Sequence, residues 1–267
     1  MNDWRVVPGS RVSLSDLPTH SKEGAPGDKS VTEHALKDLT ETISGYQERL
    51  WAEQSRSLLV VLQAMDTAGK DGTIRAVFSG VNPQGVHVTS FKTPTSHELA
   101  HDFLWRTHAA VPALGEIGVF NRSHYEDVLV VRVKNLLPET VWRPRYELIN
   151  NFEQQLAHGS TTVIKFFLHM SKEEQAKRLQ ARLDDPSKHW KFNAGDLKER
   201  ALWEDYQQAY QEAIEKTSTD VAPWYVIPSD RKWYRNWAVG KVIAETLERM
   251  DPQYPEAEEI DPDLKIV

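Results

Sequence analysis

Apolar residues follow two patterns along the chain: short unbroken runs, and longer segments in which they recur with helical spacing. The run at residues 58–62, LLVVL, is typical of a strand buried on both faces of a parallel sheet. Further strands, rich in β-branched and aromatic residues, are predicted at residues 86–91, 117–120, 161–168 and 224–227. Helices are predicted at residues 31–55, 74–79, 97–108, 143–157, 172–183, 197–216 and 233–250. Regular alternation of strand and helix predicts an α/β fold with helices on both faces of a parallel sheet.

Three segments interrupt this alternation. Residues 1–30 are rich in Pro, Gly, Ser and charge and lack periodicity, so we expect an irregular N-terminal arm. Residues 184–196, DDPSKHWKFNAGD, are polar, contain Pro and Gly, and separate two helical stretches. Residues 251–267 form an acidic tail. The remaining sequence predicts one domain over residues 31–250, with a mobile insertion at about 183–200.

Composition narrows the class of protein. A formal charge of −7 in 267 residues argues against a general nucleic-acid binder, because such binders use Lys and Arg to neutralise phosphates. The absence of cysteine excludes disulfides, thiol nucleophiles and thiolate metal sites. The sequence has no long apolar run and no export signal at its start, so we expect a cytoplasmic protein that does not enter membranes. Basic residues nevertheless gather in the motifs described next, which indicates a local site for a polyanion.

The first strand leads into a glycine-containing turn, residues 64–73, AMDTAGKDGT. Strand, turn and helix in this order suit phosphate binding, because N–H groups at a helix start face an anion. Lys70 would reach the phosphate oxygens, although Ala64 and Asp71 depart from the GxxxxGK[ST] pattern. We interpret Asp66 as a Mg²⁺ contact, direct or through water, since a carboxylate would otherwise repel phosphate. The alternatives are an exposed Lys70 in an ordinary turn and an Asp66 that caps the N–H groups of the turn.

A second polar segment, residues 121–126, follows the strand at 117–120. It should lie at the carboxyl edge of the sheet, where open α/β folds bind ligands. Arg122 can hold two phosphate oxygens with its planar guanidinium. Asn121 and Glu126 are candidates to complete a metal shell. Taken singly, these side chains would more often form surface pairs, so the hypothesis depends on their position.

The motifs AMDTAGKDGT, FNRSHYE and DDPSKHWKF, in this order and spacing, resemble the second family of polyphosphate kinases over about residues 31–250. The resemblance implies a P-loop kinase-like three-layer α/β/α sandwich with a parallel sheet and a helical lid. It also implies Mg²⁺, with Mn²⁺ as an alternative, and in-line phosphoryl transfer between polyphosphate and a nucleotide. It assigns roles to Asp66, Gly69, Lys70, Asp71, Gly72, Thr73, Arg122, Arg182 and Lys188, and we add Ala68 of the same loop. We therefore expect a catalytic group made of Asp66, Lys70, Asn121, Arg122 and Glu126, with Asp66 and Glu126 at the metal.

The charge pattern differs in one place from that of many family members, which carry an aspartate at the position of Asn121 and an amide at that of Glu126. This difference, together with VNPQGVHVTSFK, is similar to the branch that phosphorylates both AMP and ADP. The expected partners are inorganic polyphosphate and adenine nucleotides, with guanine nucleotides as an alternative, and we expect a homo-oligomer without nucleic-acid or membrane partners. The cations expected along the path of a polymeric donor are Lys92, Arg182, Lys188 and Lys191, with Arg231 and Arg235 as weaker candidates.

Two other functions stay open at this point. A nucleoside-monophosphate kinase with ATP as donor would share the phosphate loop, the sheet and a lid. A non-catalytic protein that binds polyphosphate or nucleotide is the second alternative. For residues 184–196, a lid that closes over bound phosphates and a solvated connection are equally consistent with the sequence.

Overall fold

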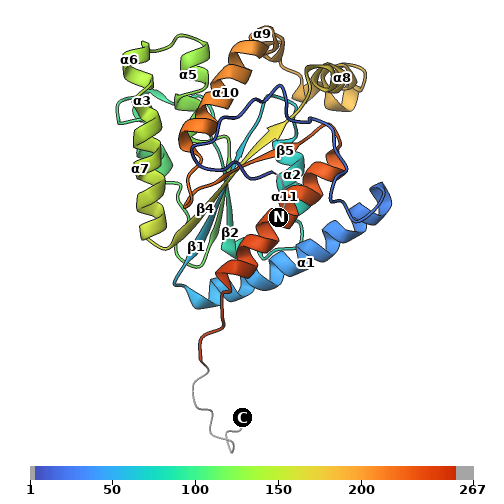
Figure 1. Ribbon diagram of the computed structural model, residues 1–267, viewed down its shortest axis with the longest axis vertical. Coiled ribbons are helices and arrows are strands. Elements are labelled where there is room, and N and C mark those ends of the chain that lie inside the picture. Colours follow the sequence, from blue (N-terminus) through green and yellow to red (C-terminus); the bar gives the residue numbers. More distant parts are fainter. Residues whose placement is uncertain (1–3, 257–267) are drawn as a thin grey trace, which may run out of the picture.

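In the computed structural model, which describes residues 4–256, a sheet of five parallel strands forms the middle layer (Figure 1). The strands lie in the order β2-β3-β1-β4-β5. Their bounds are β1 (Ser57–Gln63), β2 (Val86–Ser90), β3 (Ile117–Asn121), β4 (Thr161–His169) and β5 (Trp224–Pro228). The predicted strands and their parallel arrangement are therefore confirmed.

The position of β1 determines where a site can form. All of its residues are buried, and it pairs in parallel with β3 on one side and with β4 on the other. From β1 the chain crosses toward one edge of the sheet to form β2. From β3 it crosses toward the other edge to form β4. Open α/β sheets form a ligand crevice where adjacent strands lead in opposite directions. The carboxyl ends of β1 and β3 are therefore the expected place for a site.

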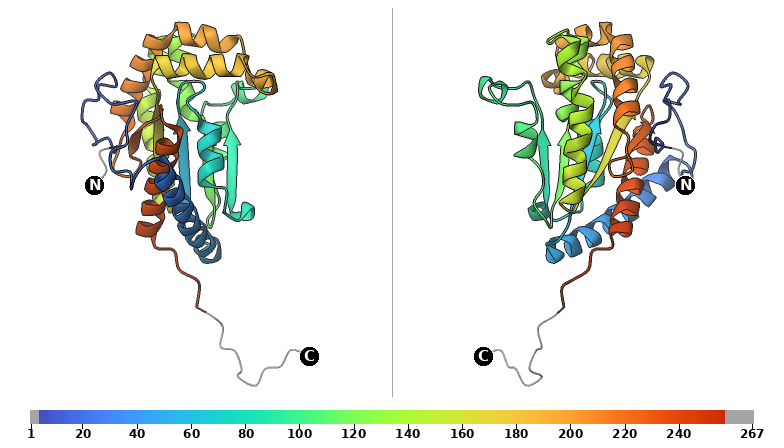
Figure 2. Two further views of the ribbon diagram at one scale, coloured as in Figure 1. Left: turned by 90° about the vertical axis from the view of Figure 1, so that its right-hand side faces the viewer. Right: turned by 60° about the vertical axis from the view of Figure 1, so that its left-hand side comes forward.

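Helices cover both faces of the sheet (Figures 1 and 2). On one face, α1 (Lys29–Glu53), α2 (Lys70–Val77) and α11 (Lys232–Met250) pack against alternate residues of the central strands. On the other face, α7 (Arg145–His158) and α10 (Trp203–Thr217) pack against the intervening residues. Burial of these apolar side chains is the main favourable contribution to folding. The arrangement confirms the predicted three-layer α/β/α sandwich.

The N-terminal arm is irregular, as expected, but it is packed against the domain. Residues 4–28 form no helix. Trp4 stands edge-on to Trp237 of α11, with ring centroids 5.7 Å apart, and joins the core on that face. At the other end of the chain, residues 257–267, which include most of the predicted acidic tail, lie outside the described residues.

The helix predicted at residues 97–108 is two short helices in the structure, α3 (Ser96–Leu99) and α4 (Trp105–His108). Between them the Asp102 carboxylate accepts a hydrogen bond from the Leu104 amide (2.9 Å). Such local bonds from an aspartate side chain compete with the helical hydrogen-bond ladder. The prediction of one continuous helix was therefore wrong at Asp102.

The predicted insertion forms short helical pieces at the carboxyl edge of the sheet. After α8 (Lys172–Leu183), the chain forms a 3₁₀ helix, η3 (Pro186–Lys191), and then α9 (Gly195–Ala201). The single helix predicted at residues 197–216 is interrupted at Leu202, because α9 buries no residue whereas α10 turns to pack on the sheet. Figure 1 shows α8 and α9 beyond the same end of the strands.

The helix after the first strand begins at Lys70 rather than at residue 74 as predicted, so part of the expected loop is helical. The remaining helices are short and were not predicted. They are η1 (Pro83–Gly85), η2 (His124–Asp127), α5 (Val130–Val133) and α6 (Glu139–Trp142). Within residues 4–256, no helix combines the length and the apolar character needed to cross a membrane.

Candidate active site

The loop between β1 and α2 has the geometry of an anion-binding turn. Gly69 precedes α2 with a φ of +105°, a conformation that favours glycine. A Cβ atom at this position would displace the guanidinium of Arg235, and the positive φ would strain any other residue there. The first N–H groups of a helix have no carbonyl partner within it and carry a partial positive charge. The start of α2 is therefore suited to bind phosphate.

Two buried arginines hold a carbonyl group of this loop. Arg235 of α11 and Arg178 of α8 both donate to the Ala68 carbonyl, at 2.6 and 3.0 Å. Burial, and then the charge of Arg178, lowers the pKa of Arg235 to about 9. Gly72 lies beside the same guanidinium, since a Cβ there would be 3.5 Å from Nη2 of Arg235. Positive charge thus surrounds the loop, and a bound anion would neutralise it.

Lys70 is buried at the start of α2, and its Nζ donates to the Ala64 carbonyl (3.0 Å). Burial, followed by the positive charge of Arg122, lowers the pKa of Lys70 to about 8, and Asp66 and Glu126 oppose part of this shift. The ammonium group is therefore held against the turn and changes its charge at slightly alkaline pH.

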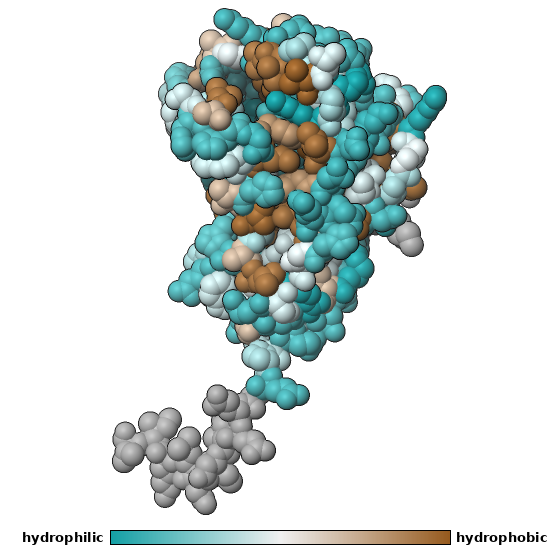
Figure 3. Space-filling model, turned by 90° about the vertical axis from the view of Figure 1, so that its left-hand side faces the viewer, coloured by the Kyte–Doolittle hydropathy of each residue, from teal (hydrophilic) through white to brown (hydrophobic). Residues whose placement is uncertain are grey.

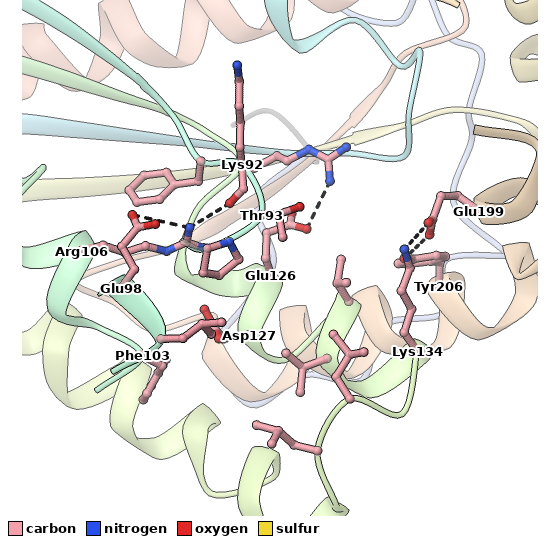
Figure 4. A pocket seen from close by; sticks show the side chains of 18 of the residues that line it. Lys92, Thr93, Glu98, Phe103, Arg106, Glu126, Asp127, Lys134, Glu199 and Tyr206 are labelled. Atoms are coloured by element: carbon pink, nitrogen blue, oxygen red, sulfur yellow. Dashed lines mark hydrogen bonds and ion pairs between the residues drawn. The ribbon is translucent and has the colours of Figure 1, made fainter. Parts of the chain in front are cut away.

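Arg122 joins the two polar segments that the sequence singles out. It follows β3 with a φ of +61°, and its amide donates to the Leu62 carbonyl at the end of β1 (3.0 Å). Its guanidinium donates to the carboxylates of Asp66 (2.5 Å) and Glu126 (3.3 Å). Figure 4 marks a bond that reaches Glu126. Burial opposes the charge of the guanidinium, but these two carboxylates outweigh burial and raise the pKa of Arg122 above its ordinary value. Arg122 therefore connects the loop after β1 to the turn after β3.

Asn121 reaches the same place because the sheet register pairs it with Leu62. Its amide Nδ2 donates to the Asp71 carboxylate (2.6 Å) in the first turn of α2. Thr73, in contrast, is turned toward α11, where its hydroxyl donates to Asn236 (3.3 Å). All of the residues predicted to be catalytic thus lie around one point at the carboxyl ends of β1 and β3.

The carboxylates of Asp66 and Glu126 face a common cation, the Arg122 guanidinium. Within residues 4–256, no group of three or more His, Cys, Asp or Glu side chains is arranged to hold a metal ion. Mg²⁺ usually takes one or two protein carboxylates and completes its shell with water and substrate phosphates. The two hard oxygen donors beside the phosphate loop therefore fit such an ion.

A cavity of about 1020 Å³ opens beside Arg122. Apolar side chains of α5, α6 and the segment between them line one wall, and apolar residues are visible on this side of the molecule (Figure 3). The polar side chains around the cavity include Lys92, Asp127 and Tyr206 (Figure 4). A mainly apolar wall with a few polar groups is typical of a small-molecule site, and the volume suits a nucleotide.

Sequence reasoning missed several residues of this cavity. Asp127 forms an ion pair with Arg145 (3.1 Å), and burial raises the pKa of Asp127 to about 6 although the charge of Arg145 lowers it. Lys134, in the loop after α5, pairs with Glu199 of α9, which also accepts a bond from the Tyr206 hydroxyl (2.5 Å). The only sequence signal was the position of Asp127 beside Glu126. These contacts link α9 to the far wall of the cavity.

The cations predicted to belong to a lid make contacts within their own segment, residues 182–196. Arg182 donates to Asp196 (3.3 Å) and to the Lys191 carbonyl (3.1 Å). Lys188 pairs with Asp185 (2.5 Å), and its side chain is 52% exposed. The Lys191 ammonium lies over the ring of Trp190, 4.8 Å from its centroid. Of the predicted donor-path cations, Lys92 lines the cavity, whereas Lys188 and Lys191 do not.

A helix-start anion loop, a bridging arginine and a nucleotide-sized cavity meet at the crevice of a parallel sheet, and these are the parts of a P-loop phosphotransferase. The family model described as polyphosphate kinase 2 (PPK2) matches residues 27–255. The chain therefore belongs to the polyphosphate kinase 2 family, as the three sequence motifs predict.

Individual relatives agree over nearly the whole chain. The AMP/ADP-polyphosphate phosphotransferase of Meiothermus ruber is 55% identical over 258 residues, which cover 97% of each chain. The ADP-polyphosphate phosphotransferase of Rhodopseudomonas palustris is 45% identical over 265 residues, covering 95% of this chain and 91% of the relative. The crystal structure of polyphosphate kinase 2 from Arthrobacter aurescens TC1 matches with a TM-score of 0.92 and 45% identity, over 98% of this chain and 92% of that chain. Fold and family are thus supported independently.

The lowered pKa of Lys70 predicts how binding of a phosphate chain depends on pH. Lys70 is charged below its pKa of about 8 and neutral above it, so affinity for inorganic tripolyphosphate should fall as pH rises through this value. Bound phosphate favours the charged form and shifts the midpoint upward. Calorimetric titration between about pH 6.5 and about pH 9.5 measures the effect. Lys70→Met is the matched control, because it retains the titration of the ligand and of Arg235. An equally steep decline in Lys70→Met would contradict the assignment.

Proposed function

We propose that this protein transfers phosphoryl groups from inorganic polyphosphate to AMP and ADP. The observation that carries the proposal is that the phosphate loop and the nucleotide-sized cavity meet at Arg122, so a donor in one and an acceptor in the other would face each other. The names of the relatives from Meiothermus ruber and Rhodopseudomonas palustris agree with this activity.

The donor end of the site is the start of α2. Backbone N–H groups of its first turn and the Lys70 ammonium would bind the terminal phosphates of polyphosphate. Arg178 and Arg235 lie on the carbonyl side of the same loop, where their charges stabilise the anion without needing to touch it. A polymer of phosphates carries many negative charges, which explains why so many cations converge here.

The acceptor end of the site is the cavity. Its apolar wall suits a nucleobase, and its mouth at Arg122 suits the phosphates of a nucleotide. The names of the relatives that act on AMP and ADP support adenine nucleotides as acceptors, and guanine nucleotides stay an alternative. Cytoplasmic location and assembly into a homo-oligomer stay predictions.

Phosphoryl transfer needs aligned phosphates and neutralised charge rather than a covalent intermediate. Arg122 is held so that its planar guanidinium can contact the transferring group, while the nucleotide phosphate in the cavity attacks in line. Kinases of this family generally need a divalent metal ion. Asp66 and Glu126 would hold Mg²⁺, or Mn²⁺ in its place, and the ion would neutralise charge on the phosphates.

A donor panel distinguishes this function from the two alternatives. Pure protein with AMP, polyphosphate and Mg²⁺ should form ADP and then ATP, and chelator should stop the reaction. Lys70→Ala and Asp66→Ala should abolish turnover with little change in Tm, because neither side chain contributes to the apolar core. Lys37→Ala, an exposed lysine on α1, is the control for loss of charge. Turnover with ATP but not with polyphosphate would select a nucleoside-monophosphate kinase, and tight binding without turnover would select a binding protein.

The lid hypothesis predicts a particular effect of Lys188→Ala. Lys188 pairs with Asp185 at an exposed position, and such pairs cost little to break, so the ammonium can turn to the phosphates when the lid closes. The substitution should lower kcat more than it raises KM for the nucleotide, since the contact would strengthen as charge develops. Steady-state kinetics with both substrates, and with Lys37→Ala beside it, provide the measurement. Equal and small effects in the two variants would rule out a lid role for Lys188.

A further inference from the structure

A charged pair lies buried below the site, between the sheet and the helices on one face. Lys165 is in the middle of β4 and Glu153 is on α7, and both side chains are excluded from solvent. Lys165 Nζ lies 2.5 Å from a Glu153 carboxylate oxygen. Burial opposes the charge of Glu153, but the Lys165 ammonium and the His124 ring outweigh burial and lower the pKa of Glu153. Buried pairs of this kind often add no stability over apolar residues of similar volume, so a different role is expected.

The Tyr125 hydroxyl completes this pair into a closed set of hydrogen bonds. Lys165 donates to the Tyr125 hydroxyl (2.9 Å) and to the Thr217 carbonyl at the end of α10 (2.6 Å), in addition to Glu153. The Tyr125 hydroxyl in turn donates to the other carboxylate oxygen of Glu153 (2.8 Å). Every N–H of the ammonium group therefore has a partner. The Tyr125 hydroxyl has one defined position relative to β4, α7 and α10.

Tyr125 belongs to the turn that carries the catalytic side chains. It is fully buried, directly precedes Glu126 and follows Arg122 by three residues. Between them, the Ser123 hydroxyl accepts a bond from the side-chain Nε2 of Gln63 (3.1 Å) and another from the backbone N–H of Tyr125 (3.2 Å). Within this one short turn, the side chains of Arg122 and Glu126 thus face the site, whereas that of Tyr125 is buried in the core.

We infer that the cluster of Tyr125, Glu153 and Lys165 is a positioning device that holds Arg122 and Glu126 in the geometry needed for transfer. The inference rests on the proposed function of the site, since it concerns a reaction in which Arg122 contacts the transferring group. Displacement of a catalytic group by about 1 Å costs on the order of 100-fold in rate. The cluster acts through the turn and does not touch substrate, so its members are positioning residues.

Tyr125→Phe is the sharpest test, because it removes one hydroxyl and retains the buried ring. The matched control is Tyr234→Phe on α11, where a buried tyrosine loses one hydrogen bond, to the Glu23 carbonyl (2.8 Å), away from the turn. Tm, kcat, KM for both substrates and hydrogen exchange of the amides at residues 122–129 are measured for both variants. The Val128 and Leu129 amides donate to the Tyr125 carbonyl and report directly on the turn.

We expect Tyr125→Phe to lower kcat roughly 10- to 100-fold, with KM values within about threefold of wild type. Tm should fall further in Tyr125→Phe, which loses two bonds to buried charged groups, than in Tyr234→Phe, which loses one bond to a carbonyl. Only Tyr125→Phe should accelerate exchange at residues 122–129. A kcat as high as that of Tyr234→Phe, or unchanged exchange in the turn, would overturn the inference. If the wild-type protein does not use polyphosphate, the proposed function fails, while the exchange measurement still decides whether the cluster holds the turn.

A double variant tests the charged pair itself. Removal of Glu153 or Lys165 alone would leave an uncompensated buried charge and endanger folding, so both are replaced, as Glu153→Leu with Lys165→Met. The double variant should keep a cooperative thermal transition and lose kcat to the same extent as Tyr125→Phe. Wild-type kcat in a folded double variant would contradict the inference. If the double variant does not fold, Tyr125→Phe decides the question.

Discussion

The bridge from Arg122 to Asp66 and Glu126 is the interaction on which the site depends. The two carboxylates come from different segments, and without a cation between them they would repel each other and any phosphate nearby. The guanidinium removes this repulsion and joins the loop after β1 to the turn after β3. Asp66, Arg122 and Glu126 all line the cavity, so in the proposed function donor and acceptor meet at this bridge.

The positive charges around the phosphate loop explain how the site would bind a phosphate chain. Lys70 and Arg235 are buried cations whose pKa values are lowered to about 8 and about 9, so burial opposes their charge while no anion is bound. A phosphate chain bound at the start of α2 would stabilise the charged forms of both side chains and raise their pKa values. The helix start, with glycine at position 69, supplies N–H donors that need no rearrangement when the anion arrives.

The sequence predicts those features of the fold and site whose residues are contiguous in the chain. Each of three features spans only a few residues: the buried run of β1, the turn at Gly69 and the polar segment after β3. Because the carboxyl ends of parallel strands meet at one edge of a sheet, the sequence also predicts that these features lie close together. The sequence does not predict the roles of Arg178 and of the Lys165–Glu153 pair, because their partners lie on other elements and meet them only when the sheet and helices pack. The interruption at Asp102 shows a third limit, since a local side-chain bond overrode an otherwise helical pattern.

In the proposed function, the role of Arg122 is to act on the transfer between two separately bound substrates. It is tested most directly by measuring kcat together with the Kd of tripolyphosphate and of ADP, each alone, in Arg122→Ala. Arg122→Ala should lower kcat at least about 100-fold and change each Kd by less than about tenfold, because the guanidinium contact strengthens as charge develops. A kcat close to that of the wild type, or a loss explained entirely by weaker binding of one substrate, would contradict it.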